Sequence, residues 1–451
     1  MSIKISNLTQ GKVLPTLLKL AFPLMGTSFL QMAYTLMAMA WIGRLGENAS
    51  RYEAAIGGIG MLLWLSSSIA YLSMIGVEVS VGQSIGARKM GRARIFASHA
   101  TTLAVVIGVI WALFLFIAAH PLLSFFKLDE QTTAEAVTFL RMVVLILPLQ
   151  FLSYNFTGIY NGSGRSTIPF KNNAIGLALN MTLDPLFMFG FNMGFHGAAV
   201  GMMISQFAVF LLFYYQIRIK GSIIGPFPFL ISMKKPYLKR VLFLGTPVSI
   251  MNSIYAIINL TLARIASIHG GHLGMMSQTT GGQIEAITWN TSQGFSTALT
   301  AFVAQNFAAN KMDRGVQAYK YTLKILGALG VIVSLAFIFY GRELFGIIVP
   351  HEDAMNAGAQ YLFAMGTVQL FLMLELTSQG MFNGIGRTIE PAVISMTFNL
   401  LRIPLAIYLA TSMGSIMGVW WAIAISTLCK GIILPLWFFF VYRRIQRKAK
   451  K

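Results

Sequence analysis

The sequence predicts an all-α membrane protein, with twelve transmembrane helices arranged as two pseudo-symmetric six-helix lobes. First, hydrophobic residues make up 56% of the 451 residues and charged residues only 11%, whereas soluble chains carry about 25% charged residues. Second, apolar segments of about 20 residues recur along the chain, and each is long enough to cross the hydrocarbon core of a bilayer. Third, the two halves of the chain share a series of short motifs.

The apolar segments predict the positions of the twelve spans. They lie near residues 14–42, 54–82, 95–119, 134–158, 168–190, 194–217, 239–266, 276–305, 316–340, 355–381, 390–412 and 416–442. Prolines, Pro185 and Pro404 among them, lie within or at the ends of several spans. Bent helices suit a protein that changes conformation. The first span precedes no small-residue cleavage site, so we expect it to be a retained helix.

The basic residues predict the orientation of the chain in the membrane. The net charge is +20, and most lysines and arginines fall in connections on one side of the predicted spans. The connections on the other side hold only Arg44, Arg51, Lys127, Arg264 and Arg342. Because such an excess marks the cytoplasmic side, we expect a multi-pass protein of the plasma (bacterial inner) membrane with both termini in the cytoplasm. We expect no nucleic-acid partner, since the basic residues are separated by apolar spans.

Four pairs of motifs recur in the same order in the two halves. The pairs are Leu20–Pro23 with Leu244–Pro247, Val81–Arg92 with Val303–Arg314, Tyr160–Arg165 with Phe382–Arg387, and Asn180 and Pro185 with Asn399 and Pro404, at offsets of 224, 222, 222 and 219 residues. We predict an N-terminal lobe at 1–218, a cytoplasmic linker at 219–238, a C-terminal lobe at 239–442 and a basic cytoplasmic tail at 443–451. Since a six-span repeat returns to the same side, we expect parallel lobes with a cavity between them.

Asp184 is the main candidate for a functional residue. It lies in the apolar run Gly176–Gly190, and Asn180 precedes it by four residues, a spacing that stacks both side chains on one face of a helix. A carboxylate in hydrocarbon is costly unless it faces a partner or a wet cavity. Burial disfavours its charged form and an approaching cation favours that form, so Asp184 could couple ion binding to export. Alternatively, Asp184 only satisfies backbone groups that Pro185 frees.

Two further acids lie within or at the start of predicted spans. Glu78 lies about one turn before a cytoplasmic Gly-Gln turn, where it either contributes to cation coupling or pairs with Arg88 or Arg92. Glu285 begins the eighth span, where it either faces the cavity as a coupling residue or pairs with Arg264 across a short loop.

The tenth and eleventh spans carry a third acid and a base. Glu375 lies in the middle of the tenth span and is also a candidate coupling residue. Arg402, on the next span, needs a counter-charge, and Glu375 is the obvious one; a permanent pair would leave neither residue free to titrate. Lys430 is expected to extend its ammonium group to the membrane interface. Polar residues that we expect to line a substrate cavity are Tyr34, Asn155, Gln206, Asn259, Gln283 and Arg402.

The motifs together resemble those of the multidrug and toxic compound extrusion (MATE) family, within the multidrug/oligosaccharidyl-lipid/polysaccharide flippase superfamily. The matching segments are Gly43–Gly46, Gly82–Ala87, Asn161–Arg165, Leu183–Pro185, Gly197–Ala199 and Val303–Asn306. The resemblance covers essentially the whole chain. It implies a V-shaped pair of six-helix lobes that exports organic cations and other amphipathic compounds, driven by inward movement of sodium ions or protons.

In one branch of that family, an Asp and an Asn on the fifth span belong to the coupling cluster. By resemblance these roles pass to Asp184 and Asn180, which could hold a sodium ion. The same branch has an Asp on the first span, where this chain has Ala38, and a hydroxyl residue on the sixth, where Met202 stands. Since two of the four parts of the sodium site are missing, the resemblance slightly favours protons.

We therefore predict a secondary active antiporter that exports cationic or amphipathic compounds in exchange for H⁺ or Na⁺ by alternating access of two lobes. The chain has no Walker loop for ATP, and its single cysteine, Cys429, excludes an intrachain disulfide. We expect a monomer without a cofactor, and no enzyme activity. One alternative is a lipid or lipid-linked oligosaccharide flippase of the same superfamily, for which Arg402 and Arg141 would have to lie in the cavity. Another is a membrane-embedded enzyme.

Overall fold

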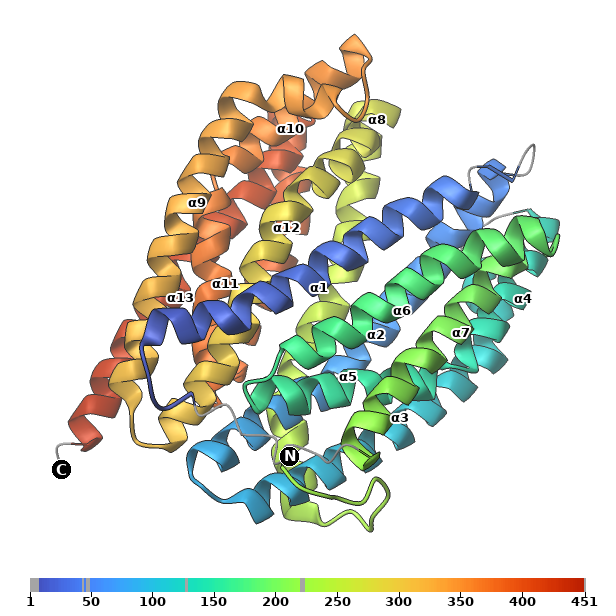
Figure 1. Ribbon diagram of the computed structural model, residues 1–451. Coiled ribbons are helices and arrows are strands. Elements are labelled where there is room, and N and C mark those ends of the chain that lie inside the picture. Colours follow the sequence, from blue (N-terminus) through green and yellow to red (C-terminus); the bar gives the residue numbers. More distant parts are fainter. Residues whose placement is uncertain (1–7, 43, 46–48, 126–128, 220–223, 450–451) are drawn as a thin grey trace. The chain divides into compact units, whose positions relative to one another are not determined.

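A computed structural model describes residues 8–42, 44–45, 49–125, 129–219 and 224–449, and in these ranges every regular element is a helix (Figure 1). The helices are α1 (Val13–Ile42), α2 (Ala49–Gly86), α3 (Met90–Ser124), α4 (Glu130–Val144), α5 (Leu147–Gly162), α6 (Thr167–Pro185), η2 (Leu186–Gly190), α7 (Phe195–Tyr214), η3 (Tyr215–Ile219), α8 (Lys235–Ala308), α9 (Met312–Gly346), α10 (Glu352–Gly366), α11 (Gln369–Gly384), α12 (Ile389–Met413) and α13 (Met417–Ala449).

The chain divides into two compact units. The first unit comprises Met1–Gln10 and Phe22–Ser249, and the second comprises Gly11–Ala21 and Ile250–Lys451. The first therefore holds most of α1, all of α2 to α7 and the start of α8, whereas the second holds the rest of α8 and α9 to α13. The predicted lobe and linker boundaries remain a prediction.

Each unit has its own apolar core. In the first unit, α2, α3, α5 and α7 enclose one cluster that includes Val77, Phe96, Phe156 and Phe213. A second cluster there surrounds Phe195, whose ring stacks on Phe139 and on Tyr52, both with ring centroids 4.7 Å apart. In the second unit the cluster includes Leu362 and Trp420, and the Trp420 ring meets the Tyr361 ring edge-on at 4.9 Å.

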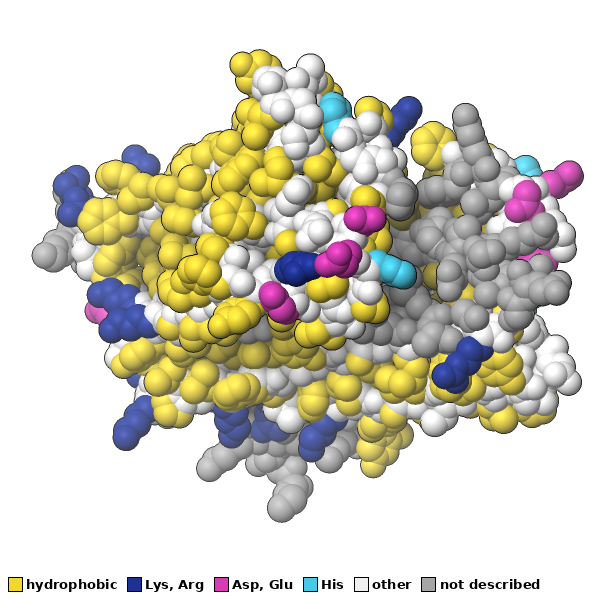
Figure 2. All heavy atoms as spheres, turned by 90° about the horizontal axis from the view of Figure 1, so that it is seen from above, with side chains coloured by type: hydrophobic (Ala, Val, Ile, Leu, Met, Phe, Trp, Pro, Cys, Tyr) yellow, Lys and Arg dark blue, Asp and Glu magenta, His cyan; other side chains and the backbone are white. Residues whose placement is uncertain are grey.

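The described helices account for all twelve predicted spans. Eight of them are long and apolar enough to cross a membrane, and the bent pairs α4–α5 and α10–α11 raise the number to ten. The remaining two predicted spans, 168–190 and 276–305, coincide with α6 plus η2 and with the part of α8 after Gly271. Figure 2 shows hydrophobic side chains over much of the described surface on this side, with a group of charged and histidine side chains near the middle of the view. The predicted all-α membrane fold class is confirmed.

The loop expected between the seventh and eighth predicted spans is part of helix α8. The connection between the seventh and eighth predicted spans is helical on both sides of Gly271, whose φ of 60° and ψ of −149° interrupt α8 at a single residue. Since glycine lacks a Cβ, it adopts this conformation at little steric cost. A one-residue kink therefore replaces the expected loop.

The internal repeat is visible in the helix boundaries. The helices α3 and α9 begin at Met90 and Met312 and end at Ser124 and Gly346, so both limits differ by 222 positions. The same offset relates α4 to α10 and α5 to α11 at both ends. The bend is 51° in α4–α5 and also 51° in α10–α11. The two units thus share one helical framework.

Candidate functional site

The predicted pair Asp184 and Asn180 forms on α6. Both side chains are buried, with 2% and 6% of their surface exposed, and Asn180 Nδ2 donates a hydrogen bond to Asp184 Oδ1. The helix ends at the next residue, Pro185, and the chain continues as the π-helical turn η2. Because proline has no N–H and clashes with the preceding turn, the backbone changes its hydrogen-bond pattern directly beside the carboxylate.

Two other helices of the first unit approach Asp184. On α7, Gly201 lies so close that a Cβ atom at this position would collide with Asp184 Oδ1. On α1, Tyr34 lies near enough to interact electrostatically with Asp184. Ala38 and Met202 are half-buried, and neither side chain carries an oxygen. Hard cations bind through several oxygens, so these two residues add nothing to a sodium site.

Glu78 lies on α2 at a different level of the first unit. It is fully buried, and neither carboxylate oxygen has a hydrogen-bond partner. Its backbone packs against Gly162, the last residue of α5, just before α6 begins at Thr167. Asp184 lies at the opposite end of α6, about 25 Å along the helix at a rise of 1.5 Å per residue. The structure therefore does not bring Glu78 and Asp184 together.

The alternative partners considered for Glu78 do not pair with it. Within the ranges that the structure describes, the ion pairs are Arg342–Glu352, Arg387–Glu390 and Lys430–Glu375. Neither Arg88 nor Arg92 reaches Glu78. The neighbour that faces its carboxyl group is the amide of Asn161 on α5, although the two groups do not meet the geometry of a hydrogen bond.

Glu375 on α11 lies in a buried polar network of the second unit. Its Oε2 is 3.0 Å from Lys430 Nζ on α13, and both side chains are 4% exposed. Its Oε1 accepts hydrogen bonds from Gln379 Nε2 and from Ser395 Oγ, each at 3.0 Å. Lys430 Nζ also donates to Asn399 Oδ1 at 3.0 Å. The carboxylate is thus held by residues from three helices.

This network corrects two sequence interpretations. Lys430 does not extend to an interface, because it is buried and paired. Arg402 does not pair with Glu375; its Nε donates to Ser426 Oγ at 2.6 Å and its Nη2 to Thr427 Oγ1 at 3.0 Å. Its guanidinium group also lies 6.0 Å from the ring centroid of Tyr255. Lys430 on α13 therefore pairs with the Glu375 carboxylate, and Arg402 is hydrogen-bonded to hydroxyl groups instead.

Glu285 is held by neutral donors in the second half of α8. Tyr361 OH donates to its Oε2 at 3.0 Å, and Gln369 Nε2 donates to its Oε1 at 3.1 Å. Thr288 Oγ1 in turn donates to Gln369 Oε1 at 2.9 Å. The alternative pair with Arg264 is not among the ion pairs of the described residues. Glu285 is therefore bonded by two neutral side chains and takes part in none of the ion pairs of the described residues.

The remaining predicted cavity residues are divided between the two units. Asn155 is fully buried on α5 and donates to Thr101 Oγ1 at 2.9 Å. Gln206 on α7 is half-buried, and Asn259 on α8 accepts a 3.5 Å hydrogen bond at its backbone oxygen from Gln278. Gln283 on α8 is exposed. Their place in a substrate cavity remains a prediction.

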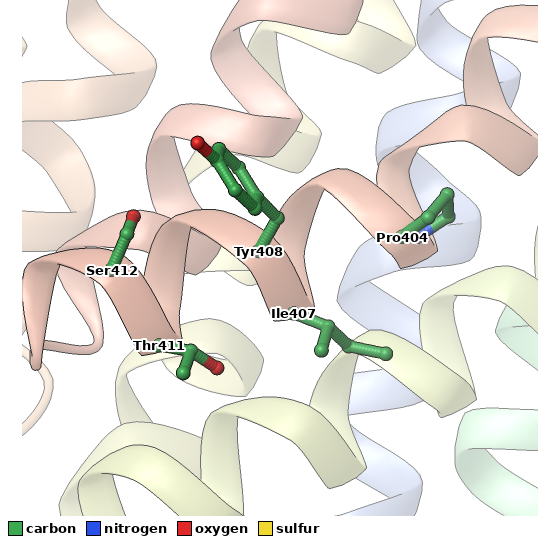
Figure 3. A pocket seen from close by; sticks show the side chains of 5 residues that line it. All are labelled: Pro404, Ile407, Tyr408, Thr411 and Ser412. Atoms are coloured by element: carbon green, nitrogen blue, oxygen red, sulfur yellow. The ribbon is translucent and has the colours of Figure 1, made fainter.

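One hollow of about 510 Å³ lies along α12, lined by Pro404, Ile407, Tyr408, Thr411 and Ser412 (Figure 3). Figure 3 shows Tyr408 and Ser412 on one side of the helix and Ile407 and Thr411 on the other, so the side chains do not converge on one point. None of the predicted coupling residues lines this hollow.

Sequence analysis overlooked most of the partners of the buried acids. Asn161, Lys430, Tyr361 and Gln369 were not predicted as site residues, although each is a polar residue in an apolar context. A local signal existed only for Gln379, which follows Glu375 by four residues and therefore lies on the same helix face.

Comparison with known proteins shows the family of this chain. The MatE family model matches residues 23–186 and 247–408. The chain is 25% identical over 416 residues to the probable multidrug resistance protein YoeA of Bacillus subtilis (strain 168), covering 88% of this chain and 87% of YoeA. It is also 25% identical over 406 residues to the probable multidrug resistance protein NorM of Thermotoga maritima, covering 86% and 84% of the two chains.

A crystal structure of a MATE protein in complex with MaD3S has the same fold, with a TM-score of 0.92 and 21% identity over 100% of both chains. The family match extends over more than half of the sequence and includes both units. The solved fold agrees with it over the full length. The chain is therefore a multi-pass membrane protein that belongs to the MatE family.

Proposed function

We propose that this protein is a secondary active antiporter that exports organic cations or amphipathic drugs in exchange for H⁺ or Na⁺ by alternating access of its two lobes. Family membership supports this proposal. So do the names of its relatives, which include the two probable multidrug resistance proteins and a multidrug export protein, MepA, of Staphylococcus aureus.

The observation that carries the proposal is the buried Asp184–Asn180 pair. Asp184 is 2% exposed and takes part in none of the ion pairs of the described residues. A buried carboxylate without a countercharge is stabilised by binding a proton or a cation. If inward and outward conformations solvate Asp184 differently, the ion and the drug alter each other's affinity, which is the thermodynamic requirement for exchange.

We favour protons as the coupling ion. A sodium ion would need several oxygen ligands. Two positions that by resemblance would add such ligands are Ala38 and Met202 here, and neither side chain carries an oxygen. A proton needs only the carboxylate and a change in its surroundings. Glu78, Glu285 and Glu375 remain further candidates for coupling, but Glu375 can exchange a proton only after its contact with Lys430 is broken.

The decisive experiment is dye efflux by Asp184→Asn. We expect ethidium efflux from a drug-sensitised bacterium to fall close to the background rate, because the neutral amide of Asn can neither bind nor release the proton. Asp353→Asn, a change at an exposed residue, should retain wild-type efflux. Repeating the assay with a proton uncoupler and without sodium identifies the ion. Undiminished efflux by Asp184→Asn would contradict the assignment.

A second candidate function is a lipid or lipid-linked oligosaccharide flippase. The buried guanidinium of Arg402 favours it, because it is bonded to two hydroxyl groups and an arginine can bind an anionic phosphate through paired hydrogen bonds. A flippase would export no ethidium. In that case Arg402→Gln should reduce the transport of a phosphate-bearing lipid and leave ethidium efflux unaffected.

The remaining parts of the proposal concern location. We place the protein in the plasma (bacterial inner) membrane with both termini in the cytoplasm, on the basis of its lysine and arginine distribution, and we expect it to act as a monomer. Reporter fusions at either end should report a cytoplasmic location.

A further inference from the structure

Glu78 and Asn161 form an unusual pair of buried polar residues outside the Asp184 site. Glu78 is 0% exposed and Asn161 is 1% exposed. All four polar atoms of the two side chains lack a hydrogen-bond partner, although the two groups face each other across α2 and α5. Buried polar atoms are nearly always hydrogen-bonded, so four such atoms in two adjacent side chains require an explanation.

The backbones of α2 and α5 touch each other beside this pair. A Cβ at Gly162 would collide with the backbone oxygen of Glu78, and one at Gly158 would collide with the backbone oxygen of Met74. The helices α2 and α5 are therefore in backbone contact on both sides of one turn. A metal cation would need several oxygen ligands, whereas a proton needs a single acceptor atom.

We propose that Glu78 and Asn161 form a proton-binding site, in which protonated Glu78 closes a ring of two hydrogen bonds with the Asn161 amide. In this ring the Glu78 O–H donates to Asn161 Oδ1, and Asn161 Nδ2 donates to the other Glu78 oxygen. A neutral carboxyl group and an amide have complementary donors and acceptors, and together they use the four unpartnered atoms. Release of the proton removes the donor to Asn161 Oδ1 and leaves a buried negative charge, so the ring opens.

Among the described residues, no charged side chain forms an ion pair with Glu78. The elements packed against α2 in this region carry Arg92, Arg94 and His99 on α3, Tyr154 and Tyr160 on α5, and Lys239 and Arg240 on α8. None of them forms an ion pair with Glu78 in the described part of the chain. Arg240 Nη2 donates to Gln83 Oε1 at 3.1 Å, and His99 Nδ1 contacts the Ile95 backbone oxygen at 2.7 Å.

The equivalent position of the second unit supports this assignment. The residue 222 positions after Glu78 is Thr300, whose Oγ1 lies 3.1 Å from the Gly380 backbone oxygen, its acceptor on α11. That contact joins the helices equivalent to α2 and α5, and it needs no proton from solvent. In the first unit the corresponding contact between α2 and α5 forms only when Glu78 is protonated.

Infrared difference spectra of the purified full-length protein, recorded between acidic and alkaline pH, test the proposal. We expect a carboxylic-acid C=O band that is lost in Glu78→Gln and retained in Asp184→Asn. Glu78→Gln keeps both hydrogen bonds through its own amide, so it should fold normally. Asn161→Leu should retain the band but move it to higher wavenumber, because the acid loses its ring partner.

The outcomes separate this inference from the proposed function, since the spectra do not involve transport. A spectrum that Glu78→Gln leaves unchanged at every pH would overturn it. A Glu78 band that disappears on addition of sodium at constant pH would also overturn it, in favour of a cation site. If Glu78→Gln loses the band but retains normal ethidium efflux, the proton site is supported and the Asp184 proposal is unaffected.

Discussion

The two units use the same helical framework but hold their buried charges differently. In the first unit, Asp184 has one amide donor and Glu78 has no hydrogen-bond partner. In the second unit, Glu375 contacts Lys430, Gln379 and Ser395, and Glu285 accepts from Tyr361 and Gln369. Neither acid of the first unit takes part in an ion pair of the described residues.

This difference bears on which unit we expect to exchange ions under the proposed function. A proton or a cation adds little stabilisation to a buried acid that already has a counter-ion and several hydrogen-bond donors. It stabilises a buried acid without a counter-ion much more. Under the proposed function we therefore expect ion exchange in the first unit, and a fixed network of buried charges in the second. Four substitutions test how differently the two units hold their buried charges.

The largest effect is expected from Lys430→Met. It leaves Glu375 as a buried charge without its counter-ion, and breaking a buried pair in this way costs about 3–5 kcal/mol. Thermal unfolding in detergent should show a clear loss of stability. The double variant Lys430→Met, Glu375→Met should recover most of it, because both charges are removed. A single variant as stable as the wild type would show that Lys430 does not compensate Glu375.

Gly201→Ala tests how tightly the first unit encloses Asp184. The added Cβ would collide with Asp184 Oδ1, and overpacking of this kind costs about 1–3 kcal/mol. We expect lower thermal stability together with reduced dye efflux. Gly60→Ala is the matched control, since nothing lies within 4 Å of its added Cβ. Equal behaviour of the two variants would contradict the packing of α7 on Asp184.

Ser395→Ala removes one donor from the compensated acid. Glu375 Oε1 keeps the hydrogen bond from Gln379, so the loss should be about 1 kcal/mol, the usual net value of one hydrogen bond. Thermal unfolding measures this change. A loss as large as that of Lys430→Met would mean that the hydrogen bond, and not the ion pair, holds the carboxylate.

The smallest effect is expected from Arg342→Gln. Its partner Glu352 lies 2.6 Å away, but the two side chains are 47% and 83% exposed. Exposed ion pairs contribute only about 0.2–1 kcal/mol and are screened by salt. The change in melting temperature should be small and should vanish in high salt. A large, salt-independent loss would place this pair in a less solvated setting than its exposure indicates.

The sequence by itself determined the features that depend on local spacing and on hydrophobic length. Twelve apolar segments predicted the helices because a helix must satisfy its own backbone in hydrocarbon. The repeat of Tyr160–Arg165 at Phe382–Arg387 predicted a framework whose helix limits recur 222 positions later. The sequence also placed Asn180 and Asp184 on one face, since residues four apart on a helix are neighbours, and the structure adds the hydrogen bond between them.

Only the tertiary structure decided which helices face each buried acid. Lys430 meets Glu375, and Tyr361 meets Glu285 across 76 residues. These contacts depend on the depth and rotation of packed helices, which are set where small residues let backbones approach, as at Gly162 and Gly201. Hydropathy carries no information on this register. The sequence therefore predicted a pair of Arg402 with Glu375 and an interfacial Lys430, whereas in the packed structure Lys430 contacts the Glu375 carboxylate.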